Sequence, residues 1–304
     1  MKALASRIVG QIGDETEVVT EIPNLTLHRF DEPTKPTGYL LEPSVCMILQ
    51  GLSAWSLATM ITSTMRPAFF VTSIDLPLIA QILEASPSDP YVGMTLKLDR
   101  MQIAQLILDS QLPSLNSGKA SRAIELGALS KPLFGAIERL IDLLAEPECI
   151  PVLSPLVQKE IVFRLLTTEC GPKIRQIATG GSHIHQISRV IDWIKGNLSE
   201  RLRVEDLAGR AGMSVSTLHH HFRSLTALSP LQFEKHLRLN EARRLMLIDR
   251  VDAAIAAFQV GCEAPRNSVG STTAEQGLAE EEALKKGRAE KSHEFTGSEL
   301  YTKA

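Results

Sequence analysis

The residues best suited to chemistry lie in a short segment near residue 220. Apolar residues recur there at helical intervals, and a helix would turn all of them inward. They are Val215, Leu218, Phe222 and Leu225. The opposite face would then carry hydroxyl, imidazole and guanidinium groups, which suit contact with base edges and phosphates in a major groove. This predicted polar face consists of Ser216, Thr217, His219, His220 and Arg223.

The histidine triplet His219-His220-His221 also raises the question of a metal site. Adjacent helical side chains point about 100° apart, so three in a row do not converge on one ion. For His219 and His220 we favour a DNA-facing role over plain solvated polar residues. His28 stands alone in the first half of the chain, which argues against a metal-dependent enzyme of the cupin type.

Two short helices joined by a turn would position the polar face. Leu207, Ala208 and Ala211 give the first helix a small apolar face that a second helix can approach closely. Gly212 suits the left-handed conformation that ends a helix, and Ser214 is a good N-cap for the next one. The pattern predicts a helix-turn-helix, although short helical hairpins with a glycine turn are common in all-α proteins.

A long helix follows from Ser229-Pro230, which reads as an N-cap and a proline at the first helical position. One face of this helix is apolar and the other is basic. The basic residues are either phosphate contacts or the solvated side of an amphipathic helix, and Arg223 shares this ambiguity. They are Lys235, Arg238, Arg243 and Arg244.

Charge is distributed unevenly along the 304 residues. The whole chain has a net charge of −3, so a nucleic-acid surface must be local. Residues 182–250 contain 11 Lys and Arg against 7 Asp and Glu, or about +4 before any histidine is protonated. The basic segment is therefore the one with the predicted helix-turn-helix.

These motifs resemble those of AraC-type transcription regulators. The likeness in the second half rests on Leu207-Ala208, Ala211-Gly212-Met213-Ser214, Ser229-Pro230-Leu231-Gln232-Phe233 and Glu241-Ala242-Arg243-Arg244-Leu245-Met246. The first half is similar to one sensor domain of that family, through Glu42-Pro43-Ser44-Val45-Cys46, Ser73-Ile74-Asp75-Leu76-Pro77 and Pro90-Tyr91. The resemblance implies two helix-turn-helix units joined by the long helix. It also implies base-reading positions for Ser216, His219 and His220.

The second unit departs from the family after Gly261. Asp252-Ala253-Ala254 and Val260-Gly261 fit, but Pro265 to Thr272 reads Pro-Arg-Asn-Ser-Val-Gly-Ser-Thr, which is a poor helix. Relatives have a recognition helix such as Pro-Ser-Gln-Phe-Ser-Arg-Glu-Tyr at this point. One set of bases encodes both peptides when it is regrouped by one position, so we infer a reading-frame shift near Ala264.

Residues 52–68 pass the same test. Trp55 to Pro67 interrupts the strand alternation, and regrouped bases spell a plausible strand, turn and strand that lead into Phe69-Phe70. Two compensating shifts would bound this segment. Codons that are incompatible with either regrouping would end the idea.

The fold class that follows is α+β. Short apolar runs broken by prolines over residues 18–99 predict strands of a small β-barrel or sandwich, and helical periodicity begins at Arg100. A further helix is predicted over Pro155–Leu166, with breaks at Gly171-Pro172 and Gly180-Gly181. We assign residues 1–180 to a cupin-like effector-sensing and dimerisation domain. Residues 181–263 form an all-α DNA-binding domain with an incomplete second unit, and residues 264–304 a poorly ordered, charged, non-family tail.

The predicted function is a sequence-specific transcription regulator that responds to a small-molecule effector. Its site residues are Ser216, Thr217, His219, His220, Arg223, Lys235 and Arg238. The expected partners are promoter DNA, an unidentified effector, a second copy in a homodimer and RNA polymerase. The alternative is a decayed regulator that keeps only ligand binding or dimerisation, with weak non-specific DNA binding.

Several classes of protein are excluded or disfavoured. No apolar run approaches the ~20 residues that cross a bilayer, and the four dispersed cysteines suit reduced thiols in a cytoplasmic protein. Cys46 reads as ordinary packing within a core strand. Asp75 and Glu84 lack the partners that acid–base chemistry needs, so we expect no catalytic residue, metal or cofactor.

Overall fold

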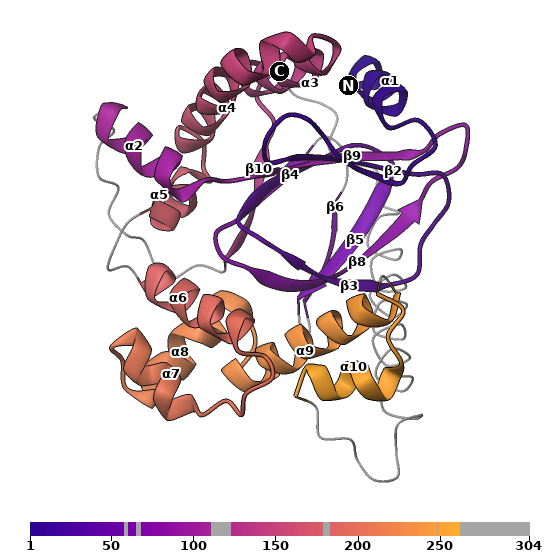
Figure 1. Cartoon of the computed structure of the whole chain (residues 1–304). Coiled ribbons are helices and arrows are strands. Elements are labelled where there is room, and N and C mark those ends of the chain that lie inside the picture. The colour runs from indigo at the N-terminus through magenta and orange to yellow at the C-terminus, as the bar shows by residue number, and fades with distance from the viewer. Residues whose placement is uncertain (58–59, 65–67, 111–122, 179–182, 248, 262–304) are drawn as a thin grey trace, which may run out of the picture.

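The chain folds into a part with two β-sheets and a part made of helices (Figure 1). This α+β architecture confirms the predicted fold class. None of the described helices has both the length and the apolar character that crossing a membrane requires. The computed structural model describes residues 1–57, 60–64, 68–110, 123–178, 183–247 and 249–261.

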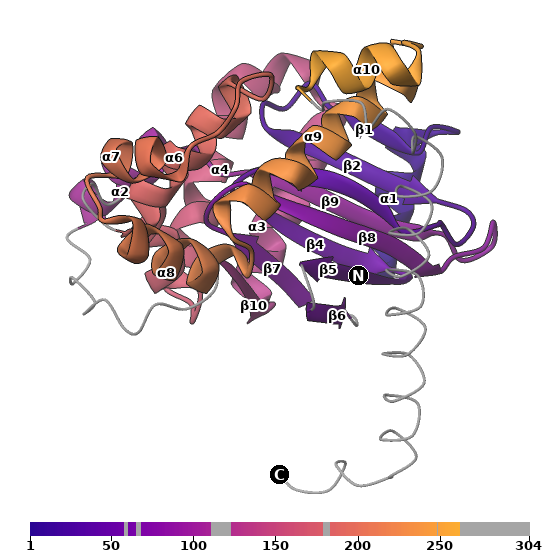
Figure 2. The same cartoon turned by 90° about the horizontal axis from the view of Figure 1, so that it is seen from below.

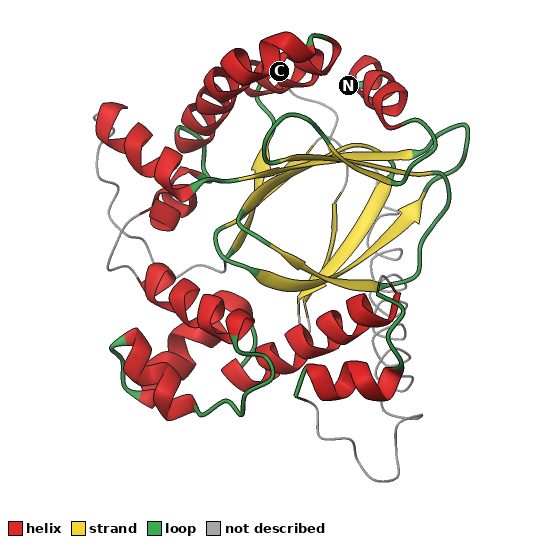
Figure 3. Cartoon of the chain, in the orientation of Figure 1, coloured by secondary structure: helices red, strands yellow, loops and turns green. Residues whose placement is uncertain are grey.

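Both sheets of the described chain are antiparallel, and they face each other as two layers (Figure 3). The larger sheet has the strand order β1-β2-β9-β4-β7-β10, and the smaller has the order β3-β8-β5-β6. The sequence analysis did not decide between a small barrel and a sandwich. The described strands form two separate sheets. The strands are β1 Glu17–Val19, β2 Leu25–Phe30, β3 Thr37–Leu41, β4 Ser44–Gln50, β5 Leu52–Leu57, β6 Met60–Thr64, β7 Ala68–Thr72, β8 Leu76–Glu84, β9 Tyr91–Lys97 and β10 Ile124–Ala128.

Helices cover the outer face of the larger sheet. Strand β4 is buried on both of its faces, which explains why its sequence is apolar at nearly every position. Val45 and Met47 pack in the core shared with these helices, whereas Cys46 belongs to the core that contains Trp55. The covering helices are α1 Lys2–Ile12, α2 Arg100–Ser110, α3 Lys131–Asp142, α4 Ile150–Leu166 and α5 Gly171–Ala178.

Three features of these helices differ from the sequence expectations. Helix α1 was not predicted, although Leu4, Ile8 and Ile12 bury one of its faces. Helix α4 begins at Ile150 and runs through Pro155, so its predicted start was five residues late. The predicted break between helices is present, but it lies at residues 167–170, and Gly171-Pro172 themselves open α5, where a proline needs no N–H donor.

The segment with interrupted alternation still forms a hairpin. Strands β5 and β6 pair with Ser53 opposite Thr64 and Trp55 opposite Thr62. Trp55 is buried, and its ring lies 5.6 Å from that of Phe70, tilted by 37°. The backbone therefore pairs in this hairpin despite the irregular sequence pattern. Whether the segment arose by frame shifts is a question for the coding DNA.

The helical part packs against the smaller sheet (Figure 2). Leu41, Leu76 and Leu78 of that sheet belong to one buried cluster with residues of α6, α7, α8 and α9. The predicted boundary near Gly180 falls in residues 179–182, and the predicted tail after residue 263 also lies outside the described residues. The helices are α6 His183–Gly196, α7 Val204–Ala211, α8 Val215–Thr226, α9 Pro230–Leu247 and α10 Ala253–Gln259.

Candidate nucleic-acid interface

Helices α7 and α8 form the predicted helix-turn-helix. Helix α7 ends at Gly212, whose φ of 64° and ψ of 37° place it in the left-handed region. Glycine adopts this region without steric cost. Helix α8 then begins at a cap, where the Ser214 hydroxyl accepts a hydrogen bond from Thr217 N at 3.2 Å. Both local predictions are confirmed, and the turn fixes how α8 leaves α7.

The apolar stripe of α8 is anchored in the interior. Leu218, Phe222 and Leu225 are buried, and the Phe222 ring meets that of Phe233 edge-on, with 5.3 Å between centroids. The prediction that Val215 joins this stripe was wrong, since its side chain is 37% exposed. As the first residue of the helix, Val215 lies ahead of the buried stripe. Three anchors are left to set the rotation of α8.

The opposite face of α8 is open to solvent. Ser216, His220 and Arg223 are exposed or partly exposed, as are Thr217 and His219. The Thr217 hydroxyl lies 2.8 Å from that of Ser214, so it belongs partly to the cap. A shallow depression runs along the face over His219, His220, Arg223 and Ser224.

The side chains at the centre of this face are available to a ligand. Within the described part of the chain, those of Ser216, His219 and Arg223 make no hydrogen bond or ion pair. These groups are therefore both accessible and unpaired, as a DNA-reading surface requires.

The basic residues of α9 do not share one role. Lys235 is exposed. Arg238 instead pairs with Glu234 at 2.6 Å and donates to the carbonyl oxygens of Glu200 at 2.7 Å and Gly261 at 3.1 Å. Its guanidinium thus joins α9 to the ends of two other segments. The structure therefore places Arg238 as an internal tie, apart from the exposed face of α8.

Arg243 and Arg244 also have distinct surroundings. Arg244 pairs with Glu241 at 2.9 Å and with Asp249 at 3.2 Å. Arg243 has no ion pair within the described residues, and its guanidinium lies beside Gly38 of β3. The basic stripe read from the sequence is therefore divided between ties to the protein itself and free cations.

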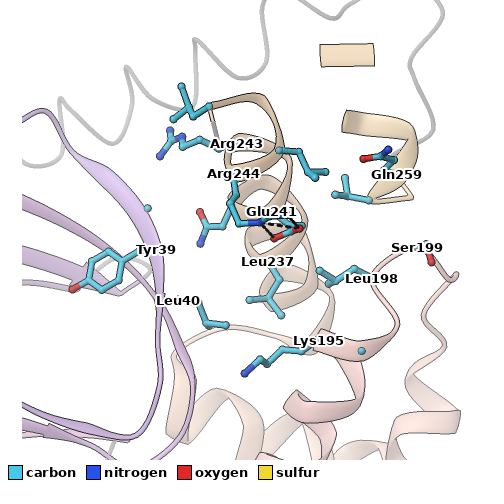
Figure 4. A pocket seen from close by; sticks show the side chains of 16 residues that line it. Tyr39, Leu40, Lys195, Leu198, Ser199, Leu237, Glu241, Arg243, Arg244 and Gln259 are labelled. Atoms are coloured by element: carbon cyan, nitrogen blue, oxygen red, sulfur yellow. Dashed lines mark hydrogen bonds and ion pairs between the residues drawn. The ribbon is translucent and has the colours of Figure 1, made fainter. Parts of the chain in front are cut away.

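A groove separates β3 from α9 (Figure 4). Leu40 and Leu237 line it with apolar surface, and Arg243 lies along the same wall. Tyr39 points away from the groove, toward the space between the sheets. Sequence reasoning missed this groove, because its walls come from segments that lie far apart in the chain.

Several polar contacts join the part with the sheets to the helices of the second half, among them an ion pair of Lys195 with Glu42 at 3.8 Å. Asp75 accepts a hydrogen bond from Lys195 of α6, an ion pair that the sequence did not predict. Burial raises the pKa of this carboxyl, and Lys195 opposes that change. Ala123 N, just before β10, donates to Leu225 O in the last turn of α8 at 3.0 Å. The sheets therefore hold α8 at its C-terminal end.

The histidines lie differently from the sequence expectation. The ring nitrogens of His28 lie 3.0 Å from Thr95 Oγ1 and 3.4 Å from Glu17 Oε2, contacts that the sequence did not predict. His221 stacks on His183 of α6, a contact that no local sequence signal reveals. Among the described residues, no group of three or more potential ligands could hold a metal ion.

Comparison with known proteins agrees with this architecture. The family model for the AraC-type transcriptional regulator N-terminus matches residues 21–173, and a helix-turn-helix domain model matches residues 207–267. The transcriptional activator RhaS of Pectobacterium carotovorum is 25% identical over 126 residues, which are 41% of this chain and 44% of that protein. RhaS of Yersinia pestis is 29% identical over 68 residues, or 22% of this chain and 25% of that protein. The matched part spans less than half the length of these relatives.

Two crystal structures of ToxT from Vibrio cholerae share the fold. Apo ToxT aligns with a TM-score of 0.53 at 10% identity, over 80% of this chain and 90% of ToxT. ToxT bound to an unsaturated fatty acid aligns with a TM-score of 0.52 at 10% identity, over 78% and 85%. The sensor-type family model alone covers half of the sequence. This chain belongs to the AraC-type family of transcriptional regulators.

Proposed function

We propose that the chain is a sequence-specific DNA-binding transcription regulator that reads a major groove with α8 and responds to a small-molecule effector. One observation carries the proposal: α8 is buried on its apolar face, and its other face presents Ser216, His219 and Arg223, whose side chains are unpaired within the described part of the chain. This polar face lies on the second helix of a helix-turn-helix, which is the helix that enters a major groove, and that position favours DNA reading over a merely solvated surface. The family membership supports the same function.

The polar groups have complementary roles in this proposal. Arg223 suits a bidentate contact to guanine, and each such contact contributes about 1 to 3 kcal/mol of discrimination. His219, His220 and Ser216 offer hydrogen bonds to other base edges. Lys235 lies at the start of α9 and suits a phosphate, which adds affinity without sequence information.

Selection from a randomised duplex pool tests the proposal. The full chain is expected to enrich one sequence and to bind it more tightly than a scrambled duplex at every salt concentration. A steep salt dependence with equal affinity for both duplexes would instead support the decayed regulator. That alternative gains weight from the sequence of Pro265 to Thr272, which departs from the recognition helix of relatives.

We propose the groove between β3 and α9 as the effector site. Leu40, Leu237 and Val260 suit an apolar chain, and Arg243, which has no ion pair among the residues that the structure describes, suits a carboxylate. The structural neighbour ToxT has been crystallised with an unsaturated fatty acid, which supports this ligand class.

Titration with oleate, followed by calorimetry, tests the effector site. Arg243→Ala is expected to weaken binding by about tenfold, as expected for a lost charge-assisted hydrogen bond. Lys131→Ala, which removes the same charge on α3, is expected to leave binding unchanged. Equal losses in both variants would contradict the site.

A second copy of the chain is the proposed partner for α4. Val152, Leu156 and Phe163 form an exposed apolar stripe with heptad-like spacing. Sedimentation is expected to show a dimer that Leu156→Glu dissociates, and a monomeric wild type would contradict the pairing. RNA polymerase as a partner and a cytoplasmic location remain predictions.

A further inference from the structure

Two imidazole rings from different helices stack beside the proposed reading face. His183 is the first residue of α6, and His221 lies on α8 next to His220. The ring centroids of His183 and His221 are 3.7 Å apart, with an interplanar angle of 17°. The His220 ring meets the His221 ring edge-on, with 5.3 Å between centroids. The stack therefore directly contacts His220, a side chain that we assign to DNA contact.

The stack belongs to a chain of contacts through three helices. His183 Nδ1 lies 3.3 Å from Gln186 Oε1, and Gln186 Nε2 donates to Ala211 O, at the end of α7, at 3.0 Å. His221 Nδ1 is buried and has no hydrogen-bond partner in the described part of the protein. The His221 ring is thus held by stacking and by its place on the helix. Its orientation depends on the neighbouring ring of His183.

The groups that face His221 are all basic. Burial lowers the pKa of His221, and the imidazoles of His183 on α6 and His220 on α8 lower it further. No carboxylate contributes to this shift. Two protonated imidazoles at stacking distance repel each other, so the stack takes up at most one proton without separating. The stacked arrangement is therefore fully present above the ordinary histidine pKa of about 6.5 and weakens as the pH falls.

We propose that His183 and His221 are positioning residues that hold the reading face of α8 in register, and that specific DNA recognition weakens on acidification because their stack breaks. This inference rests on the proposed DNA-reading function. The direction of the pH effect is diagnostic, because the positive charge that a protein gains at low pH attracts phosphates and strengthens non-specific binding. Specific and non-specific affinity therefore change in opposite directions.

The test compares two duplexes over a range of pH with the full chain. One is the sequence selected from a randomised pool by the wild type at pH about 8, and the other is its scrambled version. Fluorescence anisotropy at constant ionic strength gives the ratio of the two affinities down to pH about 5.5. In the wild type this ratio is expected to fall, approaching about tenfold per pH unit where separation of the two rings is accompanied by the uptake of one additional proton.

Substitutions at His183 distinguish the effect of its aromatic ring from the effect of its protonation. His183→Phe keeps an aromatic ring that also tolerates a protonated His221, so the ratio is expected to stay within about twofold of wild type at pH ~8 and to change little with pH. His183→Ala removes the ring and is expected to lower the ratio at every pH. His236→Gln removes an imidazole from α9, away from the stack, and is expected to keep the wild-type profile.

The outcomes distinguish this inference from the function on which it rests. Parallel pH profiles for the wild type and His183→Phe would overturn the positioning role of the stack. Failure of the wild type to select any duplex at pH ~8 would instead overturn the proposed DNA reading. Circular dichroism at each pH shows whether a variant is folded, and a folded His183→Ala with a wild-type ratio would also overturn the inference.

Discussion

Helices α7 and α10 could each be the first helix of a helix-turn-helix, but their apolar faces are covered to different extents. Helix α7 ends at a left-handed glycine, Gly212, and its apolar face is covered by α8. Helix α10 is also followed by a left-handed glycine, Gly261. Its Ile255 and Phe258, however, are 53% and 83% exposed. The two helices differ in what covers them: α8 covers the apolar face of α7, whereas Ile255 and Phe258 of α10 have no such cover among the described residues.

The largest expected contrast is between two phenylalanines. Phe222 is a buried anchor of α8, whereas Phe258 is exposed on α10. Phe222→Ala is expected to lower the free energy of unfolding by about 3 to 5 kcal/mol, because it removes a buried ring. Phe258→Ala is expected to change it by only about 0.5 kcal/mol, as is usual for a surface substitution. Urea unfolding followed by circular dichroism measures both, and similar losses would mean that α10 is covered as well as α8.

Adding a recognition helix after α10 would remove the difference between α7 and α10. Replacement of residues 265–272 by Pro-Ser-Gln-Phe-Ser-Arg-Glu-Tyr is expected to strengthen specific binding, because each added bidentate base contact contributes about 1 to 3 kcal/mol. The measurement is the ratio of affinities for the selected and scrambled duplexes. An exchange that inserts the same residues in scrambled order is the matched control. An equal gain in both would show that composition alone accounts for it.

Arg223 sharpens the comparison at the level of one side chain. It is exposed and makes no ion pair among the described residues, so Arg223→Ala should leave the unfolding free energy nearly unchanged. The same variant is expected to weaken specific binding by about 1 to 3 kcal/mol. Arg244→Ala removes the same charge from a guanidinium that is paired with Glu241 and is expected to have little effect on DNA affinity. Anisotropy titration at fixed salt measures both, and a larger loss for Arg244→Ala would move the reading face to α9.

The helix caps give the smallest expected effect. Ser214 caps α8 and Asp252 caps α10, where its Oδ1 accepts from Ala254 N at 2.8 Å. Replacing either by alanine is expected to cost about 1 kcal/mol of stability. Only Ser214→Ala should also weaken DNA binding, because α8 carries the proposed reading face. Thermal melts and duplex titrations would separate the two caps, and a loss of affinity in Asp252→Ala would contradict the assignment.

The sequence predicted local features of the site well. Gly212 and Ser214 act within a few residues of themselves, so their conformations follow from residue type alone. The inward turn of Leu218 and Phe222 followed from their spacing. The exposure of the polar face was the necessary complement of that burial.

Contacts between distant segments could not be predicted. Arg238 is tied to the carbonyl oxygens of Glu200 and Gly261, and Asp75 pairs with Lys195. The stack of His183 on another helix is of the same kind. Periodicity reports which face of a helix is buried, but not which segment covers it. The roles of the predicted site residues in DNA binding accordingly remain predictions.

The buried cluster that unites the smaller sheet with the α6–α9 helices has a consequence for how such proteins are recombined. Leu41, Leu76 and Leu78 pack among residues of all four helices, and Ala123 bonds to the end of α8. Cutting the chain near residue 181 would remove that support from α8 and expose apolar patches on both fragments, which would favour aggregation. The helical half therefore cannot be exchanged as an independent unit. A hybrid with a sensor domain from another protein would also need the matching β-strand surface.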